Sequence, residues 1–516
     1  MVHLLMIGAV AAIVLRESLS RPAFESFASS FGGATAWTLG PMAFFVLLAW
    51  ARAWASGRRL DRVGDAREVI AAERWAGGAR AACAAWFALG VLGFGWLDRV
   101  RALVGDPVLL DELLALLPLC LAMIATWWAS HPIERRVREA LLFRALEQGR
   151  ALHRPPGRAR AVWMTTRHQL LFVLVPMSLI LSWAEGVAVA FNAAFRDPGG
   201  FWGRALPAWA LDRAEWVAPL AQMLGVLVVM AFAPAILRFV WDTTPLGPGP
   251  LRDHLRAMCA RHRVRISGLL VWRTGGTMIN GAVLGLVWPA RYVLLTDALL
   301  DALTRREVEA VMAHEIAHVR RRHMPWLAGT VLGTLVLVGS GLTLLGAALP
   351  GRFGSGEGAG FVIAVASFVV AGAVFGWVSR VFERQADAFA AQHMTSSADD
   401  RTPDETASIA SETKTDAATD AGEAMHVTPE AAAAMAGALQ RVAVLNHVAI
   451  HRFTFRHGSI ADRQRRLWQA VGCPLDALPA DRAARRAKRA GLAIMGAAAA
   501  FLLLEAWLSA SPGAGV

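Results

Sequence analysis

Cysteine is scarce in this sequence, and its few copies are scattered. The four cysteines are Cys83, Cys120, Cys259 and Cys473, with no C-x-x-C pair among them. This spacing predicts neither a disulfide framework nor a zinc site made of thiolates. Charge is also scarce, because Asp, Glu, Lys and Arg make up 18% of the 516 residues while 56% are hydrophobic. Such a composition predicts an integral membrane protein.

The charges that are present are unbalanced, with a net charge of +12. On a soluble protein this excess would suggest nucleic acid as a partner. Here the basic residues cluster between apolar runs. Loops between membrane spans are often basic on the cytoplasmic side, and this explains the clusters without nucleic acid. We therefore expect a lipid bilayer and no nucleic acid as partners of this chain.

Eight apolar runs approach the ~20 residues needed to cross a bilayer. They are 34–51, 81–97, 108–130, 169–190, 217–240, 326–350, 359–379 and 490–509. A shorter run, 2–15, lacks a basic start and a clear cleavage site, so a cleaved signal peptide is not expected. It is either a short span or a helix lying at the membrane interface.

The loops between these runs alternate in charge. Arginine-rich segments are 52–67, 134–167, 252–265, 305–322 and 452–489, and segments with far less positive charge are 98–106, 195–215 and 351–358. Threading the chain through the eight runs puts every strongly basic segment on one side of the membrane. This side is predicted to be the cytoplasm. The composition, rich in Arg, Gly, Ala and Val, suggests a high-GC bacterium, so the membrane is expected to be a bacterial inner membrane.

One cytoplasmic segment carries the motif HEIAH, residues 314 to 318. Thr304 and Glu307 form a capping-box pattern that predicts a helix start. On that helix His314 and His318 lie one turn apart on the same face, where both can bind one metal ion. Glu315 adjoins the first histidine and can accept a proton from water that the metal activates. Incidental surface histidines on an ordinary helix are the alternative.

A catalytic zinc site needs a third protein ligand. The extension H-E-x-x-H-x-x-G-x-x-H is absent, because position 321 is Arg and position 324 is Met. His323 comes five residues after His318, so we expect it to point away from the ligand face as an ordinary polar residue. Downstream, Glu383 could bind zinc, and Asp387 could accept the N–H of a ligating histidine. Alternatively, both acids are solvated or paired with neighbouring arginines.

Taken together, these segments resemble a known family. HEIAH, a membrane hairpin and then S-R-x-x-E-x-x-A-D-x-x-A resemble the HtpX and CAAX prenyl protease family of membrane zinc metallopeptidases. The stretch TMINGAVLG is similar to the family's asparagine segment, and RHGSIADRQRRL to its H-P-x-x-x-x-R-x-x-x-L. Gly458 stands where the family usually has proline. The resemblance covers about 242–470 without the acidic insert, and residues 1–240 match nothing comparable.

The resemblance implies roles for further residues. With His314 and His318, Glu383 would complete a site for one Zn²⁺ per chain, and Asp387 would support a ligand. Asn280, after Gly275 and Gly276, would hydrogen-bond an extended peptide substrate or would be a simple turn residue. His457 or Arg463 would act on the oxyanion side, although Arg463 could equally be structural, holding Glu383 or Asp387.

Two other polar residues invite a role. Tyr292 is the single tyrosine of the chain and could donate to an oxyanion, but it lies in a strand-like segment and is better read as a half-buried strand aromatic. Glu185 lies within an apolar run. A carboxylate there either lines a water-filled cavity or pairs with another helix.

The predicted fold class is mainly α, a polytopic membrane protein with a zincin-like catalytic domain at the cytoplasmic face that carries a small β-sheet. VRISGLLVW and RYVLLTDALL are predicted as short strands or strand-to-helix units, and WDTTPLGPGP as a linker. The predicted parts are an N-terminal membrane region (1–240), a first catalytic part (241–325), a transmembrane hairpin (326–380), a helix with the third ligand (381–394), a disordered acidic insert (395–428), a second catalytic part (429–488) and a C-terminal span (489–516).

The predicted function is that of a zinc metalloendopeptidase acting on protein substrates at the membrane. Quality control of membrane proteins, processing, and cleavage of a lipidated C-terminus remain open as substrate classes, and the first two are favoured. A non-catalytic scaffold or transporter that keeps the fold is the alternative.

Overall fold

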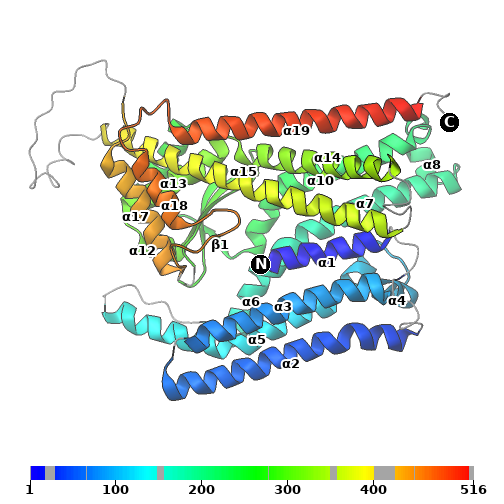
Figure 1. The fold of residues 1–516 in the computed structure, drawn as a ribbon, viewed down its shortest axis with the longest axis horizontal. Helices are drawn as coiled ribbons and strands as arrows, with labels where there is room; N and C mark the ends of the chain where they lie inside the picture. Colours follow the sequence, from blue (N-terminus) through cyan, green and yellow to red (C-terminus); the bar gives the residue numbers. More distant parts are fainter. Residues whose placement is uncertain are drawn as a thin grey trace, which may run out of the picture. The chain divides into compact units, whose positions relative to one another are not determined.

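A computed structural model describes residues 2–17, 22, 30–65, 67–147, 156–276, 278–348, 357–399, 425–446 and 448–510. The chain divides after Asp242 into two compact units, which are described separately. The first unit, Met1–Asp242, is helical throughout its described part. The second, Thr243–Val516, combines helices with a small sheet (Figure 1).

The first unit consists of helices of very different length. They are α1 (Val2–Glu17), α2 (Phe31–Val63), α3 (Arg67–Gly93), α4 (Trp96–Val104), α5 (Leu110–Glu147), α6 (Arg158–Thr166), the π-helical turn η2 (Arg167–Leu171), α7 (Phe172–Arg196), α8 (Phe201–Ala205), α9 (Ala208–Leu211) and α10 (Ala214–Val240). The buried side chains of Met6, Phe87 and Met123 bring α1, α3 and α5 into one apolar core.

Two of the prolines inside these long helices free backbone carbonyls that neighbouring helices satisfy. Pro41 of α2 has no N–H to donate to the carbonyl of Trp37, four residues earlier. The indole Nε1 of Trp86 on α3 donates to that carbonyl at 2.7 Å instead. Likewise the carbonyl of Trp128, four residues before another helical proline, accepts from the guanidinium of Arg158. The hydrogen bonds that proline removes are thus replaced by contacts between helices.

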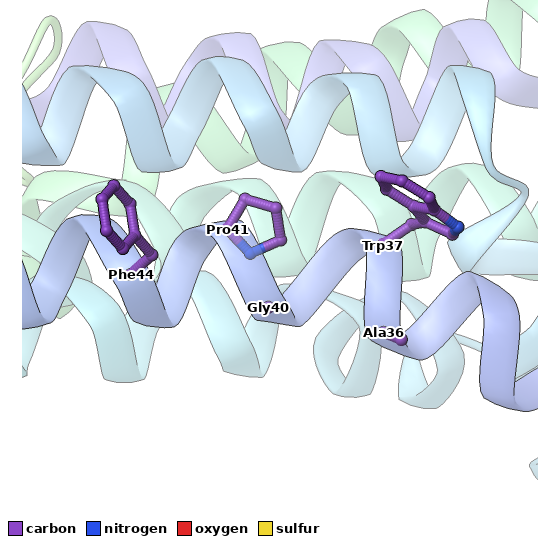
Figure 2. A pocket seen from close by; sticks show the side chains of 5 residues that line it. All are labelled: Ala36, Trp37, Gly40, Pro41 and Phe44. Carbon is purple, nitrogen blue, oxygen red and sulfur yellow. The ribbon is translucent and has the colours of Figure 1, made fainter.

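The same part of α2 carries a shallow apolar hollow (Figure 2). Its lining residues are Ala36, Trp37, Gly40, Pro41 and Phe44. No lining side chain is charged, as expected for a helix surface that faces hydrocarbon.

Eight helices in the described part of the chain are long and apolar enough to cross a membrane, and each overlaps one of the eight predicted runs. The predicted run 81–97 is too long at its end, because α3 stops at Gly93 and the chain turns through Gly95, with φ +66°, into α4. The apolar run near the N-terminus forms a helix shorter than the eight. A multi-pass membrane protein that is mainly α with a small sheet is confirmed.

The acidic residues of the first unit lie against specific partners. Arg101 pairs with Asp111 at 2.6 Å and with Glu112 at 2.9 Å. Glu185 on α7 accepts the backbone N–H of Leu109, just before α5, at 2.8 Å. This contact agrees with the structural alternative for Glu185, in which it joins two helices.

The second unit begins with a mixed four-stranded sheet. Its strands are β1 (Thr243–Pro245), β2 (Gly268–Trp272), β3 (Gly281–Leu284) and β4 (Tyr292–Thr296), in the order β1-β2-β4-β3. β2 and β4 are parallel, whereas β1 and β3 pair antiparallel at the two edges. The predicted strands correspond to β2 and β4, and Tyr292 lies on β4 as expected. β1 and β3 were not predicted.

The helices of this unit are α11 (Pro250–Arg261), α12 (Asp297–Ala302), α13 (Arg305–Arg320), α14 (His323–Ala348), α15 (Glu357–Asp399), α17 (Pro429–Leu445), α18 (Ile460–Gln469) and α19 (Pro479–Ala510). α14, α15 and α19 pack side by side, while α13, α17 and α18 gather at one end of α15 (Figure 1). The segment predicted as a linker before residue 251 includes β1 and the start of α11. α15 continues to Asp399, past the predicted start of the insert at 395, and residues 400–424 lie outside the described part.

Candidate metal centre and active site

α13 holds the HEIAH motif in a rigid position. The capping box is present, since the Thr304 side chain accepts from Glu307 N–H and the Glu307 carboxylate accepts from Thr304 N–H. Met312 and Ile316 lie on the face of α13 that is turned away from solvent, and both are fully buried. This packing in the core of the second unit fixes the direction in which the histidines of the motif project.

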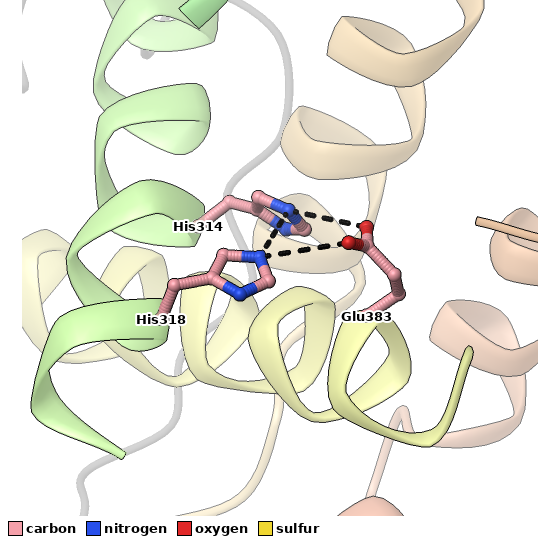
Figure 3. A group of neighbouring side chains, drawn as sticks. All are labelled: His314, His318 and Glu383. Atoms are coloured by element: carbon pink, nitrogen blue, oxygen red, sulfur yellow. Dashed lines mark hydrogen bonds and ion pairs between the residues drawn. The ribbon is translucent and has the colours of Figure 1, made fainter. Parts of the chain in front are cut away.

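α15 brings Glu383 to the two histidines of α13, as Figure 3 shows. The Nε2 atoms of His314 and His318 lie 3.2 Å apart. Glu383 Oε2 lies 3.5 Å from His314 Nε2, and its Oε1 lies 3.7 Å from His318 Nε2. The ligand atoms of these three residues all lie within 4.8 Å of one another, the one such group among the described residues.

These distances fit a tetrahedral zinc ion. Ligands at about 2.0–2.2 Å from zinc place neighbouring ligand atoms about 3.3–3.6 Å apart, close to the observed separations. Two histidines and a glutamate are also a donor set of catalytic zinc sites, which leave a fourth position open. The residues present therefore fit a zinc ion.

A buried ion-pair group lies behind the three residues. His314 Nδ1 faces Asp387 Oδ1 at 3.0 Å. Arg463 of α18 binds Asp387 in a bidentate manner, with Nε and Nη2 at 2.8 and 2.6 Å. Its Nη1 also lies 3.5 Å from Glu383 Oε2. Arg463 is thus placed to hold both acids. This is the structural role that the sequence analysis considered for it, alongside a role at the oxyanion.

The arginines next to the acids on α15 have other partners. Arg384 pairs with Asp462 at 3.5 Å, and Arg380 donates to the carbonyl of Phe455 at 2.8 Å. The alternative in which Glu383 and Asp387 pair with these arginines is therefore wrong. Both acids are buried and face α13 and α18 instead.

Glu315 points from α13 to the edge strand β3. Its carboxylate accepts the backbone N–H of Val283 at 3.2 Å. Gly281 allows this close approach, because a Cβ there would lie 2.9 Å from the side chain of Val311. Glu315 is therefore held beside both His314 and the edge of the sheet.

His457 lies at the open side of the group. Its Nδ1 is 3.0 Å from Glu383 Oε1, and the side chain is 47% exposed. The neighbouring Gly458 has φ +74° and exchanges two backbone hydrogen bonds with Thr454. Proline cannot adopt a positive φ and has no N–H to donate. This loop therefore cannot have, at position 458, the proline that is usual in the family.

Asn280 is exposed at the start of β3, one residue before Gly281. Gly275 and Gly276, with φ of +65° and +74°, form the turn that precedes it. Asn446, which the sequence did not single out, holds this segment by accepting from Ile279 N–H at 2.9 Å and donating to its carbonyl at 2.7 Å.

His323 contradicts its prediction. It was expected to point away as an ordinary polar residue of the same helix, but α13 ends at Arg320 and the chain turns at Arg322, which has φ +54°. His323 begins α14, is 1% exposed, and its Nδ1 lies 3.1 Å from His318 Nδ1. No glycine or proline lies at the break itself, and the nearest is Pro325 in the first turn of α14.

Charge and burial shift the pKa values of the groups on α13. Burial opposes protonation of His314, but hydrogen bonds to Asp387 and Glu383 prevail and raise its pKa to about 10. Burial, followed by the charge of His314, lowers the pKa of His318 to about 3. Burial also raises the pKa of Glu315, against the opposing charge of His314.

Three comparisons show which known proteins this chain is similar to. Residues 274–467 match the model of peptidase family M48. The protease HtpX homolog of Aeropyrum pernix is 28% identical over 200 residues, which are 36% of this chain and 62% of that protein, so the match spans about three fifths of the relative's length. A crystal structure of S. mikatae Ste24p aligns at 12% identity with a TM-score of 0.33, covering 84% of this chain and 97% of that one.

The family match includes the α13 histidines, Glu383 and Arg463, the residues that carry the resemblance noted in the sequence. Residues 274–467 are therefore similar to peptidase family M48, in agreement with the resemblance to HtpX and CAAX prenyl proteases inferred from the motifs.

Proposed function

We propose that this chain is a zinc-dependent endopeptidase of the membrane, with His314, His318 and Glu383 as the metal ligands. The observation that carries the proposal is the His-His-Glu group at zinc-compatible distances, directly beside Glu315, within a peptidase family M48 domain. Zinc held there would act as a Lewis acid that activates water and polarises the carbonyl of the scissile bond.

The surrounding residues have distinct tasks in this proposal. Glu315 accepts a proton from the attacking water and passes it to the leaving amine. Asp387 holds His314 with Nε2 free for the metal, and Arg463 holds the two buried acids in place. His457, exposed beside Glu383, is the group able to donate to an oxyanion from the open side.

Substrate is proposed to bind as an extended strand at the edge of the sheet. β3 pairs with β4 on one side, and on its other side Val283 N–H donates to Glu315. An extended peptide added along that edge would pass directly beside the base. The exposed amide of Asn280 would hydrogen-bond its backbone.

We place the site at the cytoplasmic face of a bacterial inner membrane, because every strongly basic segment falls on its side of the predicted topology. Protein substrates associated with the membrane, cleaved for quality control or processing, fit this location. The Aeropyrum pernix relative is itself a protease HtpX homolog.

Metal content and cleavage of purified, detergent-solubilised protein test the proposal together. Wild type is expected to hold about one zinc ion per chain and to cleave an unstructured protein substrate. Glu383→Ala should lose the zinc. Glu315→Gln should keep it while cleavage falls by about 10²–10⁴-fold, because the base is lost. Glu430→Gln, an exposed acid on α17, is the control expected to change neither.

Three outcomes would contradict parts of the proposal. Zinc retained by Glu383→Ala would mean that another residue is the third ligand. Cleavage retained by Glu315→Gln would remove its role as base. Absence of both zinc and cleavage in wild type would favour the non-catalytic scaffold or transporter.

A further inference from the structure

The two histidines of α13 have their second ring nitrogens held in different ways. His314 Nδ1 faces the carboxylate of Asp387 directly. His318 Nδ1 faces no carboxylate but the Nδ1 atom of His323, at 3.1 Å. A contact between two neutral imidazole nitrogens can be made in either direction, so it does not by itself choose the tautomer of His318.

The direction is set further along the same chain of contacts. His323 Nε2 lies 2.9 Å from Gln385 Oε1, and Gln385 Nε2 donates to Asp481 Oδ1 on α19. An ionised carboxylate only accepts hydrogen bonds, so Gln385 must turn its NH₂ group to Asp481 and its carbonyl to His323. The guanidinium of Arg321 lies 3.7 Å from the same carboxylate.

Each remaining contact then has one direction. His323 must donate from Nε2 to the Gln385 carbonyl, and its Nδ1 is therefore an acceptor. His318 must donate from Nδ1 to that acceptor. Its Nε2 is left with a free lone pair, and this is the atom that lies 3.2 Å from His314 Nε2 and 3.7 Å from Glu383 Oε1.

We propose that Asp481, Gln385 and His323 form a positioning chain that fixes the ring orientation and tautomer of His318 for metal binding. The proposal rests on the proposed zinc site and deepens it. None of the three residues is a proposed ligand, so each acts through His318. The chain starts on α19 and passes through α15 and the first residue of α14 before it reaches α13.

Burial and packing keep this chain in place. His323, Gln385 and Asp481 are 1%, 4% and 6% exposed. The ring of His323 stacks on Phe382 at 4.4 Å with an angle of 6° between the planes. Water is thus kept from competing for these hydrogen bonds, and the stacked ring has one orientation toward His318.

The test measures zinc affinity of the full-length, detergent-solubilised protein by competition with a chelator. In His323→Phe the stacked ring remains but the acceptor is lost, so we expect zinc affinity to fall about 10–100-fold. In His323→Asn the amide oxygen can take the place of Nδ1, and affinity should return to within about threefold of wild type. His393→Phe replaces another buried histidine of the second unit and is the control expected to bind like wild type.

Asp481→Asn tests the direction of the hydrogen bonds in the positioning chain and hardly changes the shape of the side chain. An asparagine amide can donate as well as accept, so Gln385 is no longer forced to present its carbonyl to His323. We expect zinc affinity to fall about 10-fold and the visible spectrum of the cobalt-substituted protein to change. A role limited to packing would leave both unaltered.

The outcomes separate this inference from the proposed function. Wild-type affinity in His323→Phe and Asp481→Asn, together with loss of zinc in Glu383→Ala, would overturn the positioning chain and keep the metal site. No zinc in wild type would overturn both. Equal weakening in His323→Phe, His323→Asn and His393→Phe would indicate general destabilisation and would also overturn the positioning chain.

Discussion

Arg463, Asp387 and Glu383 show how this molecule buries charge beside a metal site. The guanidinium binds Asp387 through two nitrogens and reaches Glu383 with the third. Its charge offsets one of the two carboxylates, and His314 completes the group. The electrostatic balance of these buried groups thus depends on a cation at His314, either a proton or the metal ion.

The exchange between proton and metal predicts the pH dependence of zinc binding. Because hydrogen bonds raise the pKa of His314 to about 10, metal-free protein holds a proton there at neutral pH. Zinc must displace that proton, so its affinity should rise about tenfold per pH unit between about pH 6 and pH 8. Chelator competition at constant ionic strength, corrected for protonation of the chelator, measures the slope.

Asp387→Asn is the matched variant for this measurement. It removes the carboxylate that favours the protonated imidazole, so the slope should become shallower above about pH 7. A slope near zero in wild type would show that His314 is neutral before the metal binds and would contradict the prediction.

The site residues found from the sequence and those missed differ in how far along the sequence their partners lie. His314, Glu315 and His318 are neighbours on one helix turn, so helical geometry alone placed them together. Glu383 needed a family pattern, because nothing local distinguishes it from other acids on α15. Asn446 contacts Ile279 across 167 positions of sequence, and no local pattern marks such a pair.

At the scale of elements, periodicity and chain length decided what could be predicted. The long apolar helices and the capped α13 have strong local signals. β1 and β3 have three and four residues and contain proline or glycine, so they become strands only because β2 and β4 provide neighbours. The turn at Arg322, which separates α13 from α14, has φ +54° at a residue other than glycine, so no glycine marks it in the sequence.

The segment before β3 is held by Asn446, which directly follows α17, and this predicts the effect of a single substitution. In Asn446→Ala the buried backbone N–H and carbonyl of Ile279 lose their partners, which should cost about 1–3 kcal/mol of stability. Asn280 and β3 should shift with them, so KM for a peptide substrate should rise while zinc content stays unchanged. Thermal unfolding and steady-state kinetics measure the two effects.

Gln440→Ala on the same helix is the control, because Gln440 contacts Gln464 and not the sheet. An equal rise in KM for both variants would show that the effect comes from α17 as a whole. Loss of zinc in Asn446→Ala would place the segment closer to the metal site than proposed.

At the scale of the whole molecule, hydropathy was the strongest signal, and all eight predicted runs overlap helices able to span a membrane. The fold class followed from that count and from the two strand-like segments. The side of the membrane on which the site lies depends on charge alone and stays a prediction. It rests on arginine-rich segments such as 452–489.

Cysteine labelling of the full-length protein tests this orientation. With the four native cysteines replaced, Arg204→Cys should react with an impermeant maleimide added to intact cells, because the segment 195–215 is predicted to lie outside. Arg465→Cys should react only after the membrane is opened. Both positions are exposed in the structure. The reverse pattern would move the proposed active site to the outer face.

Asp481 stands late in the chain, on the first turn of α19, yet its carboxylate ends the hydrogen-bonded chain that begins at His318. A ribosome reaches this residue long after it has made α13 and α15. A nascent polypeptide therefore carries its pair of histidines and Glu383 for some time without the support that orients His318. In the proposed peptidase, full zinc affinity therefore arrives only with the synthesis of α19, and a partly made chain should bind zinc more weakly than the finished one.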